Sequence, residues 1–372
     1  MNKQAIIIFL IIIFCFSARA QKTTVDKNLK DFENYHLQTV QLEKSESLLS
    51  DNVDEAFKIA LRVLNNSDQK ECPEIVAKAN FIIGKCHLLK QEYDEALICF
   101  IKAEELQRSI NDTIGLSSTL LLKGKTYFQK KELNKALSEF MKTMQNIDGD
   151  TMDVVYLDLY ELLAKTYFSR SQNDSGFYYY QQVIPRLEQE NNQKRLGHIY
   201  FNMAFYYHNN KDYDNALSFY YKGLESNKIS KNLKLLSNCY NNIGLINLEL
   251  DLFEEALDSF NKSKIYTQQM NDTVSVSQVF NNLGLVYKNM GNYALANHNF
   301  AHGLMLADRI GNERTIAMIR NNIGLMFNIN EQYDSALNSF YVSYDLYKKL
   351  NVEWSLANTC NNIAFTYYQL GN

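Results

Sequence analysis

The chain has 372 residues, of which 46% are apolar and 13% aromatic, and its formal net charge at pH 7 is −4. This acidic balance, without a long run of like charge, makes a nucleic acid an unfavourable partner, because phosphate backbones are bound by clustered Lys and Arg. The six cysteines have no recurring spacing. A disulfide framework is therefore not expected, and apolar packing has to supply the stability of the fold.

The first 20 residues are typical of a secretory signal peptide. Lys3 supplies the positive start, residues 5–16 are apolar, and Ala18-Arg19-Ala20 matches a cleavage site between small residues. The apolar run has about 12 residues, whereas a helix that crosses a bilayer needs ~20, which disfavours an uncleaved anchor. A lipid anchor on Cys15 is disfavoured because Phe14 stands where a small residue is expected. We therefore expect an exported protein, periplasmic in a Gram-negative bacterium or secreted, without a transmembrane span after cleavage.

Residues 21–67 differ in pattern from the remainder of the chain. Residues 21–30 are polar, and we expect them to be disordered. Residues 31–67 are predicted to form a degenerate first helical hairpin, because Ala56 keeps the spacing of the later units while Lys44 replaces their small residue. End repeats of an array are usually atypical, because their outer face meets solvent.

From Pro73 onward a pattern with a period of forty residues governs the chain. A small residue returns at Gly84, Gly124, Ala164, Ala204, Gly244, Gly284, Gly324 and Ala364. Twelve residues later stand Ala96, Ala136, Gly176, Ala216, Ala256, Ala296 and Ala336, and four further on Phe100, Phe140, Tyr180, Tyr220, Phe260, Phe300 and Phe340. Apolar residues lie at helical spacing on both sides of a polar turn, so each unit is predicted to be a hairpin of a first helix A and a second helix B.

These residues resemble the tetratricopeptide repeat (TPR) family. Leu283-Gly284-Leu285-Val286-Tyr287, with Ala296 and Phe300, matches its signature residue for residue. The resemblance implies an all-α fold, a right-handed α-solenoid of antiparallel helix hairpins. The family's usual period is 34 residues. The longer period is similar to that of kinesin light chains, of Leu-Gly-Asn-repeat adaptors and of Bacteroidota-type periplasmic sensor arrays.

One unit departs from the pattern and is predicted to divide the array. It has a long polar turn at residues 169–175, Gly176 in place of alanine, and Pro185 within helix B. An interior proline kinks or ends a helix, so Pro185 either bends helix B or terminates it. We expect two modules, residues 68–195 and residues 196–372, the second ending in an unpaired helix A.

A search for reactive or metal-binding groups favours a protein that is not an enzyme and needs no cofactor. His298 and His302 stand four residues apart, which is metal-ligand spacing, but they lack a third ligand and the glutamate of a zinc protease motif. They are interpreted as histidines of the convex surface. His87 stands where other units have tyrosine and is interpreted as a core residue.

The variable positions of helix A favour a binding groove instead. At 100° per residue, the positions two before and one after each small residue lie opposite helix B and would line a concave groove. In the later units the first position is Asn202, Asn242, Asn282, Asn322 and Asn362, and the second is Phe205, Leu245, Leu285, Leu325 and Phe365. In the earlier units the first is Ile82, Leu122 and Leu162, and the second is Lys85, Lys125 and Lys165.

Two interpretations of these rows stay open. An amide carries donors and an acceptor and can pair with any peptide backbone, and the resemblance implies this use of an asparagine ladder. Alternatively, each asparagine bonds to the neighbouring helix and only fixes packing. The lysines would attract carboxylates, or, as Glu161 and Lys165 at a spacing of four suggest, pair within their own helix.

The leading functional hypothesis is an exported scaffold that holds an extended peptide segment of a partner in its groove. The alternative is the periplasmic input part of a signalling protein, such as a histidine kinase or a helix-turn-helix regulator, truncated before its transmembrane and output parts. The last helix A, with Cys360, Ile363, Ala364 and Tyr367 on its inner face, has no helix B after it. We expect a second copy or a downstream segment to cover that face.

Overall fold

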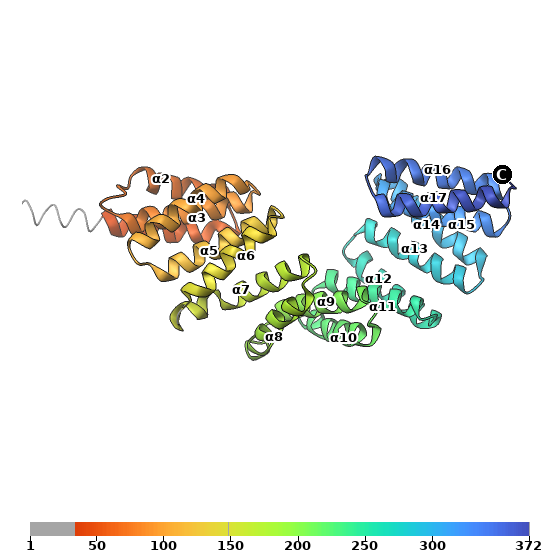
Figure 1. Ribbon diagram of the computed structural model, residues 1–372, viewed down its shortest axis with the longest axis horizontal. Helices are drawn as coiled ribbons and strands as arrows, with labels where there is room; N and C mark the ends of the chain where they lie inside the picture. Colours follow the sequence, from red (N-terminus) through yellow and green to blue (C-terminus); the bar gives the residue numbers. More distant parts are fainter. Residues whose placement is uncertain (1–33, 148, 372) are drawn as a thin grey trace, which may run out of the picture. The chain divides into compact units, whose positions relative to one another are not determined.

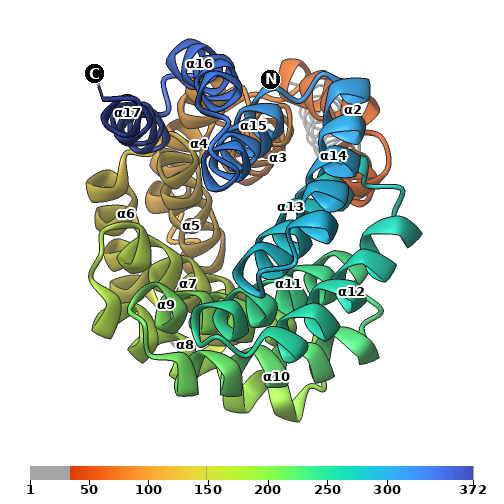
Figure 2. The same cartoon turned by 90° about the vertical axis from the view of Figure 1, so that its right-hand side faces the viewer.

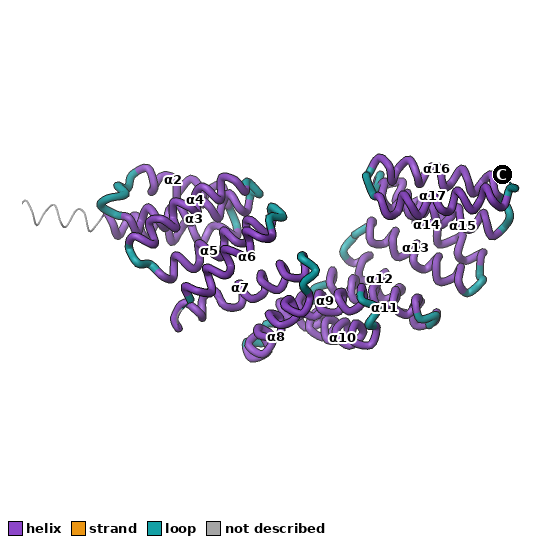
Figure 3. Tube along the Cα trace, in the orientation of Figure 1, coloured by secondary structure: helices purple, strands orange, loops and turns teal. Residues whose placement is uncertain are grey.

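The computed structural model describes residues 34–147 and 149–371, and within them the regular elements are helices, with no strand (Figure 3). The chain forms two compact units, unit 1 up to Val183 and unit 2 from Ile184 onward. Figure 1 labels their helices in chain order. The predicted signal peptide and the polar segment after it lie outside the described residues. None of the described helices combines the length and the apolar character needed to cross a membrane.

Unit 1 is a succession of helical hairpins. Residues 34–47 are helical and are followed by the short 3-10 helix η1. The elements are η1 (Leu48–Ser50), α2 (Val53–Asn65), α3 (Pro73–Leu89), α4 (Tyr93–Ser109), α5 (Thr113–Gln129), α6 (Leu133–Asn146), α7 (Gly149–Ser169) and the first part of α8 (Asn173–Gln189). Helices α3, α5 and α7 are the A helices, and α4, α6 and α8 are the B helices.

Unit 2 continues the same alternation of A and B helices. Its elements after α8 are α9 (Gln193–Asn209), α10 (Tyr213–Ile229), α11 (Leu233–Glu249), α12 (Phe253–Gln269), α13 (Thr273–Asn289), α14 (Tyr293–Ile310), α15 (Glu313–Ile329), α16 (Tyr333–Lys349) and α17 (Glu353–Gln369). Each A helix packs against the next A helix, and α14 and α16 lie on one side of the row formed by α13, α15 and α17 (Figure 2). The predicted solenoid of helix hairpins is confirmed.

Most helices end in the same kind of turn, and α2 and α6 are exceptions among the described helices. In the turn after α3, Gln91 has φ +63° and the Glu92 amide donates to the His87 carbonyl at 2.9 Å, which satisfies a carbonyl that the helix end leaves free. A residue with positive φ recurs at this point of successive turns, and it is a glycine at Gly291 and Gly311. Before several of the following helices, an asparagine or aspartate side chain caps the helix N-terminus, as Asp112 does for the Gly115 amide at 2.9 Å.

The small residue of helix A makes room for the aromatic ring of helix B. A Cβ added at Gly284 would lie 2.6 Å from Phe300, and one at Gly124 would lie 2.4 Å from Phe140. The five repeats with glycine at this position carry phenylalanine in helix B, and the two with alanine, Ala164 and Ala204, carry Tyr180 and Tyr220. These aromatic side chains are fully buried, so the contact between glycine and phenylalanine sets the distance between the helices of a hairpin.

Helix α8 and helix α17 depart from the regular repeats. Pro185 lies inside α8, and the helix continues to Gln189, so the proline does not terminate it. At the other end, α17 packs against α15 and α16, and Cys360, Ala364 and Tyr367 remain exposed on the face that a helix B covers in earlier repeats.

Candidate functional site

The five asparagines of the predicted row occupy equivalent positions on α9, α11, α13, α15 and α17. Asn322 is buried, and Asn202, Asn242, Asn282 and Asn362 are half-buried. We use the name A-helix face for the surface of unit 2 that carries these residues together with Phe205, Leu245, Leu285, Leu325 and Phe365.

Three of these asparagines connect neighbouring A helices. The Nδ2 groups donate from Asn282 to Asn241 at 2.9 Å, from Asn322 to Asn281 at 2.7 Å, and from Asn362 to Asn321 at 3.0 Å. For these three the packing interpretation therefore describes an observed role. A primary amide has two N–H donors and an acceptor oxygen, so one bond to a neighbour leaves further capacity for a ligand.

The acceptors of this ladder were missed in the sequence, although the signal was present. Asn-Asn pairs stand at 241–242, 281–282, 321–322 and 361–362. The first asparagine of a pair accepts from the second asparagine of the next pair, 41 residues later. In α9 the acceptor position is occupied by Phe201, so the ladder begins at Asn241.

The apolar positions of the A-helix face form a stripe beside the ladder. Leu245, Leu285 and Leu325 are half-buried, Phe205 is 48% exposed and Phe365 is 53% exposed. Each A helix contributes one such residue, and the exposed rings stand on α9 and α17. The stripe offers apolar surface that water contacts and that a ligand would cover.

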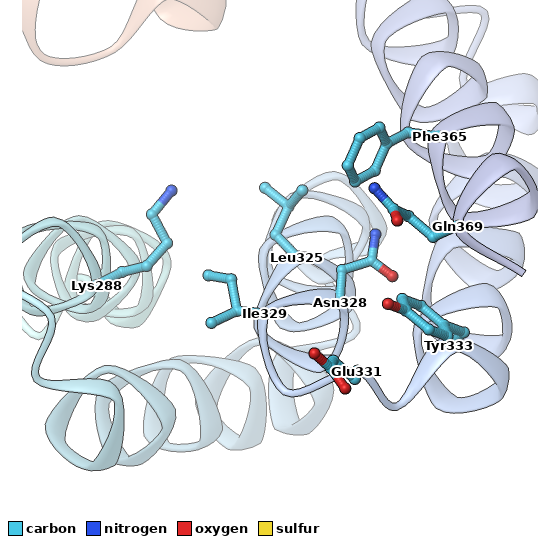
Figure 4. A pocket seen from close by; sticks show the side chains of 8 residues that line it. All are labelled: Lys288, Leu325, Asn328, Ile329, Glu331, Tyr333, Phe365 and Gln369. Carbon is cyan, nitrogen blue, oxygen red and sulfur yellow. The ribbon is translucent and has the colours of Figure 1, made fainter.

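A pocket of about 390 Å³ opens at one end of this stripe (Figure 4). It is lined by Lys288, Leu325, Asn328, Ile329, Glu331, Tyr333, Phe365 and Gln369. The Asn328 amide is held in place, because it donates to Thr366 Oγ1 at 2.8 Å and accepts from it at 3.2 Å. Two predicted site residues, Leu325 and Phe365, thus meet in one cavity with groups that were not singled out in the sequence.

The three predicted lysines of unit 1 differ in their surroundings. Lys85 donates to Glu46 at 2.9 Å and lies over the Phe81 ring. Lys165 lies 4.0 Å from Glu161, as the alternative interpretation expected, while Lys125 is exposed. Two of the three lysines therefore already have acidic neighbours in the same unit.

A different lysine of unit 1, Lys123, is buried and was overlooked. Its Nζ contacts Glu104 and lies 3.3 Å from Glu139, and Arg108 and Lys142 flank these two carboxylates. Burial opposes its charge, but hydrogen bonding to Glu104 and attraction by Glu139 outweigh burial and raise the pKa of Lys123. Its position before Gly124 is occupied in other repeats by apolar residues such as Ile243 and Leu283, and this break in the pattern was the available signal.

The histidines have local partners. His302 stacks on Phe280 with ring centroids 4.2 Å apart, and His298 lies 6.5 Å from His302. His87 Nδ1 lies 2.6 Å from Glu92, and its ring meets Phe57 edge to face. Over the described part of the chain, no group of three or more His, Cys, Asp or Glu side chains is placed to hold a metal ion.

Comparisons with known proteins agree with this geometry. The sequence model of the tetratricopeptide repeat matches residues 77–110 and 197–229. A search of curated protein sequences gave no match.

Solved structures with the same fold share little sequence with the chain. The apo form of RapI is similar with a TM-score of 0.67 and 14% identity over 90% of this chain and 98% of its own. The quorum sensor NprR from B. thuringiensis, also in its apo form, is similar with a TM-score of 0.64 and 13% identity over 90% of this chain and 94% of its own. A signal transduction ATPase with a tetratricopeptide repeat sensor, from Pyrococcus horikoshii, is similar with a TM-score of 0.66 and 13% identity over 87% of this chain and 55% of its own.

Proposed function

Because the chain carries tetratricopeptide repeats, we propose that it is an exported scaffold that binds an extended peptide segment along the A-helix face of unit 2. The carrying observation is the stripe of Phe205, Leu245, Leu285, Leu325 and Phe365 beside an amide ladder. Apolar side chains would hold side chains of the peptide, and the remaining amide groups would pair with its backbone.

The spacing of the helices defines the length of such a peptide. Packed helix axes lie about 8–10 Å apart, so five A helices span four gaps, or ~40 Å. An extended strand rises ~3.3 Å per residue and would cover this distance with about 12 residues. The proposed ligand is therefore a segment of about 12 residues.

A sensor role is the second candidate. Two of the solved structures with this fold are of a quorum sensor and of a protein with a tetratricopeptide repeat sensor. In this candidate the same face binds a signal peptide outside the cytoplasm, and binding is passed to an output part. Fractionation of cells that produce the full-length protein tests the export that both candidates share, because the protein should leave the cytoplasm and lose its first 20 residues.

The exposed face of α17 is a further candidate for a partner. Trp354 is 80% exposed and Tyr368 is 77% exposed, beside Cys360, Ala364 and Tyr367. In this proposal a second copy or a downstream segment covers this face. Sedimentation of wild-type protein and of Tyr367→Glu tests the dimer, and an unchanged monomer in both would exclude it.

Peptide binding is tested with a displayed library of random 12-residue peptides. Peptides selected on the wild-type protein are titrated by fluorescence anisotropy against Leu285→Arg and Phe205→Arg, which place a charge in the stripe. We expect each variant to weaken binding at least about tenfold, equivalent to ~1.4 kcal/mol. Ile265→Arg, at an apolar residue of helix α12 that is exposed to nearly the same extent as Phe205, is the control. Circular dichroism verifies that all three variants are folded, and equal binding by all of them would contradict the proposal.

A further inference from the structure

The pocket at the end of the stripe combines apolar walls with a cation. Leu325 and Ile329 of α15 and Phe365 of α17 supply apolar surface, and Ile329 is 43% exposed. Its volume of about 390 Å³ falls in the lower part of the range of small-molecule sites. A pocket of this size has room for one or two peptide side chains.

Lys288 is the cationic group of this pocket. It stands in the last turn of α13, on the side of this helix that faces Leu325 and Ile329 of α15 (Figure 4). The side chain is half-buried, and burial lowers the pKa of Lys288. Among the described residues no carboxylate lies within ion-pair distance of its ammonium group, in contrast to Lys85 and Lys123 of unit 1.

The position of Lys288 has a partial structural explanation. A cation in the last turn of a helix is stabilised by the helix dipole, which contributes about 0.3–1 kcal/mol at exposed sites. The helix dipole does not explain why Lys288 also lines a cavity with apolar walls. Removing water from a charge without pairing it is unfavourable, so an anion that enters the pocket gains an interaction that the protein does not satisfy internally.

Of the residues that line the pocket, Lys288 is the one cation and Glu331 the one carboxylate, and Asn328, Tyr333 and Gln369 are neutral. Glu331 is exposed in the turn after α15, where water screens its charge, and it is separated from Lys288 by Ile329 (Figure 4). Asn328 is oriented by Thr366. The positive charge of the pocket therefore belongs to the α13 side, where Lys288 stands.

We propose that this pocket receives a carboxylate of the bound peptide, which pairs with Lys288 while an adjoining apolar side chain covers Leu325, Ile329 and Phe365. This inference rests on the proposed function and deepens it, because it defines the class of peptide as one with a carboxylate next to an apolar residue. The carboxylate belongs either to an Asp or Glu side chain or to the C-terminus of the peptide.

A charge reversal tests the pairing. The 12-residue library is selected in parallel on wild-type protein, Lys288→Glu and Lys288→Met. We expect wild-type protein to enrich a carboxylate beside an apolar residue, Lys288→Glu to enrich Lys or Arg at that place, and Lys288→Met to lose the preference. Lys234→Glu, an exposed residue of α11 with the same change in net charge, should enrich the same peptides as the wild type.

Synthetic versions of one selected peptide identify the source of the carboxylate. Replacing its Asp or Glu by Asn or Gln, or amidating its C-terminus, should weaken binding to wild-type protein by about tenfold in one of the two cases. The same change should leave binding to Lys288→Met nearly unaltered. Peptides that bind without a carboxylate, or whose preference ignores the charge at position 288, would overturn this inference and leave the proposed function intact. A library from which no variant selects any peptide would count against both.

Discussion

Units 1 and 2 use the same repeat but connect their helices with different chemistry. Unit 1 has an ion pair between Lys85 and Glu46 and a buried ionic network in which Lys123 of α5 contacts Glu104 of α4 and Glu139 of α6. In unit 2 neutral hydrogen bonds between asparagines connect neighbouring A helices, such as that from Asn322 to Asn281, and the ion pair between Lys349 of α16 and Glu313 of α15 is largely exposed. Ion pairs respond to pH and salt, whereas amide bonds do not titrate.

This difference between the units indicates that each repeat contains two sets of residues with separate roles, the packing contact inside the hairpin and the polar residues that connect helices. The contact between glycine and phenylalanine is the same in Gly124 of unit 1 and Gly284 of unit 2, and it sets the fold. The polar residues around this contact are charged in unit 1 and are asparagines in unit 2, so the same fold accepts either kind of side chain. They determine how a unit responds to its surroundings and what its A helices present to a ligand.

Removal of the central cation of unit 1 should have the largest effect. Lys123→Met leaves Glu104 and Glu139 without their shared partner, and breaking a buried ionic network costs about 3 kcal/mol. Hydrogen exchange should accelerate in α4, α5 and α6 and remain unchanged in unit 2. Lys125→Met, an exposed lysine two residues away, is the control. Unchanged exchange in Lys123→Met would show that the network does not stabilise unit 1.

The same variant should lose its effect in acid. Burial alone would raise the pKa of Glu104, but hydrogen bonds from Lys123 and Arg108 outweigh burial and lower it. A lowered carboxyl pKa stabilises the fold above the unfolded value of about 4.3 and ceases to do so as the pH falls through the folded value. The raised pKa of Lys123 implies a second loss only at strongly alkaline pH. Urea unfolding should therefore separate wild type from Lys123→Met at neutral pH and bring them together in acid.

A methyl group at the shared contact should affect both units equally. The added Cβ in Gly124→Ala or Gly284→Ala meets a phenylalanine ring at 2.4 or 2.6 Å, and such overpacking costs about 1–3 kcal/mol. Gly223→Ala is the matched control, because its Cβ would lie 3.5 Å from Cys239 Sγ, an ordinary contact. Alanine is favoured over glycine within a helix, so the control should be neutral or slightly stabilising. A stable Gly284→Ala would show that the ring moves aside at little cost.

Loss of one ladder acceptor should have a smaller effect that does not depend on salt. Asn281→Ala leaves the buried Asn322 amide without its acceptor, which costs about 1–2 kcal/mol. Hydrogen exchange of α13 and α15 should accelerate equally at low and high salt. A strong dependence on salt would contradict the assignment of a neutral ladder to unit 2.

The smallest effect is expected for the surface pair of unit 1. Lys85 and Glu46 are both partly exposed, and such pairs contribute roughly 0.2–1 kcal/mol. Lys85→Met should reduce the stability of α3 slightly at low salt and have no effect at high salt, as monitored by hydrogen exchange. An effect as large as that of Lys123→Met would remove the distinction between the surface pair and the buried network.

The period of forty residues was sufficient to predict the hairpins, because a contact such as Gly284 with Phe300 lies within one repeat and returns with it. The ladder was harder to predict, because its bonds join asparagines 41 residues apart, and only the groove position of each pair had been considered. The pocket requires Lys288, Leu325 and Phe365 of three different helices to meet. Their side-chain directions depend on packing between repeats, which helical periodicity alone does not specify.

The location of the bound peptide is tested most directly by photocross-linking. A selected 12-residue peptide is synthesised with a photoreactive phenylalanine analogue at successive positions, and the cross-linked residues are identified by mass spectrometry. We expect cross-links to Phe205, Leu245, Leu285, Leu325 and Phe365 in an order that follows the peptide. Cross-links confined to the B helices α10, α12, α14 and α16, or to unit 1, would contradict binding on the A-helix face of unit 2.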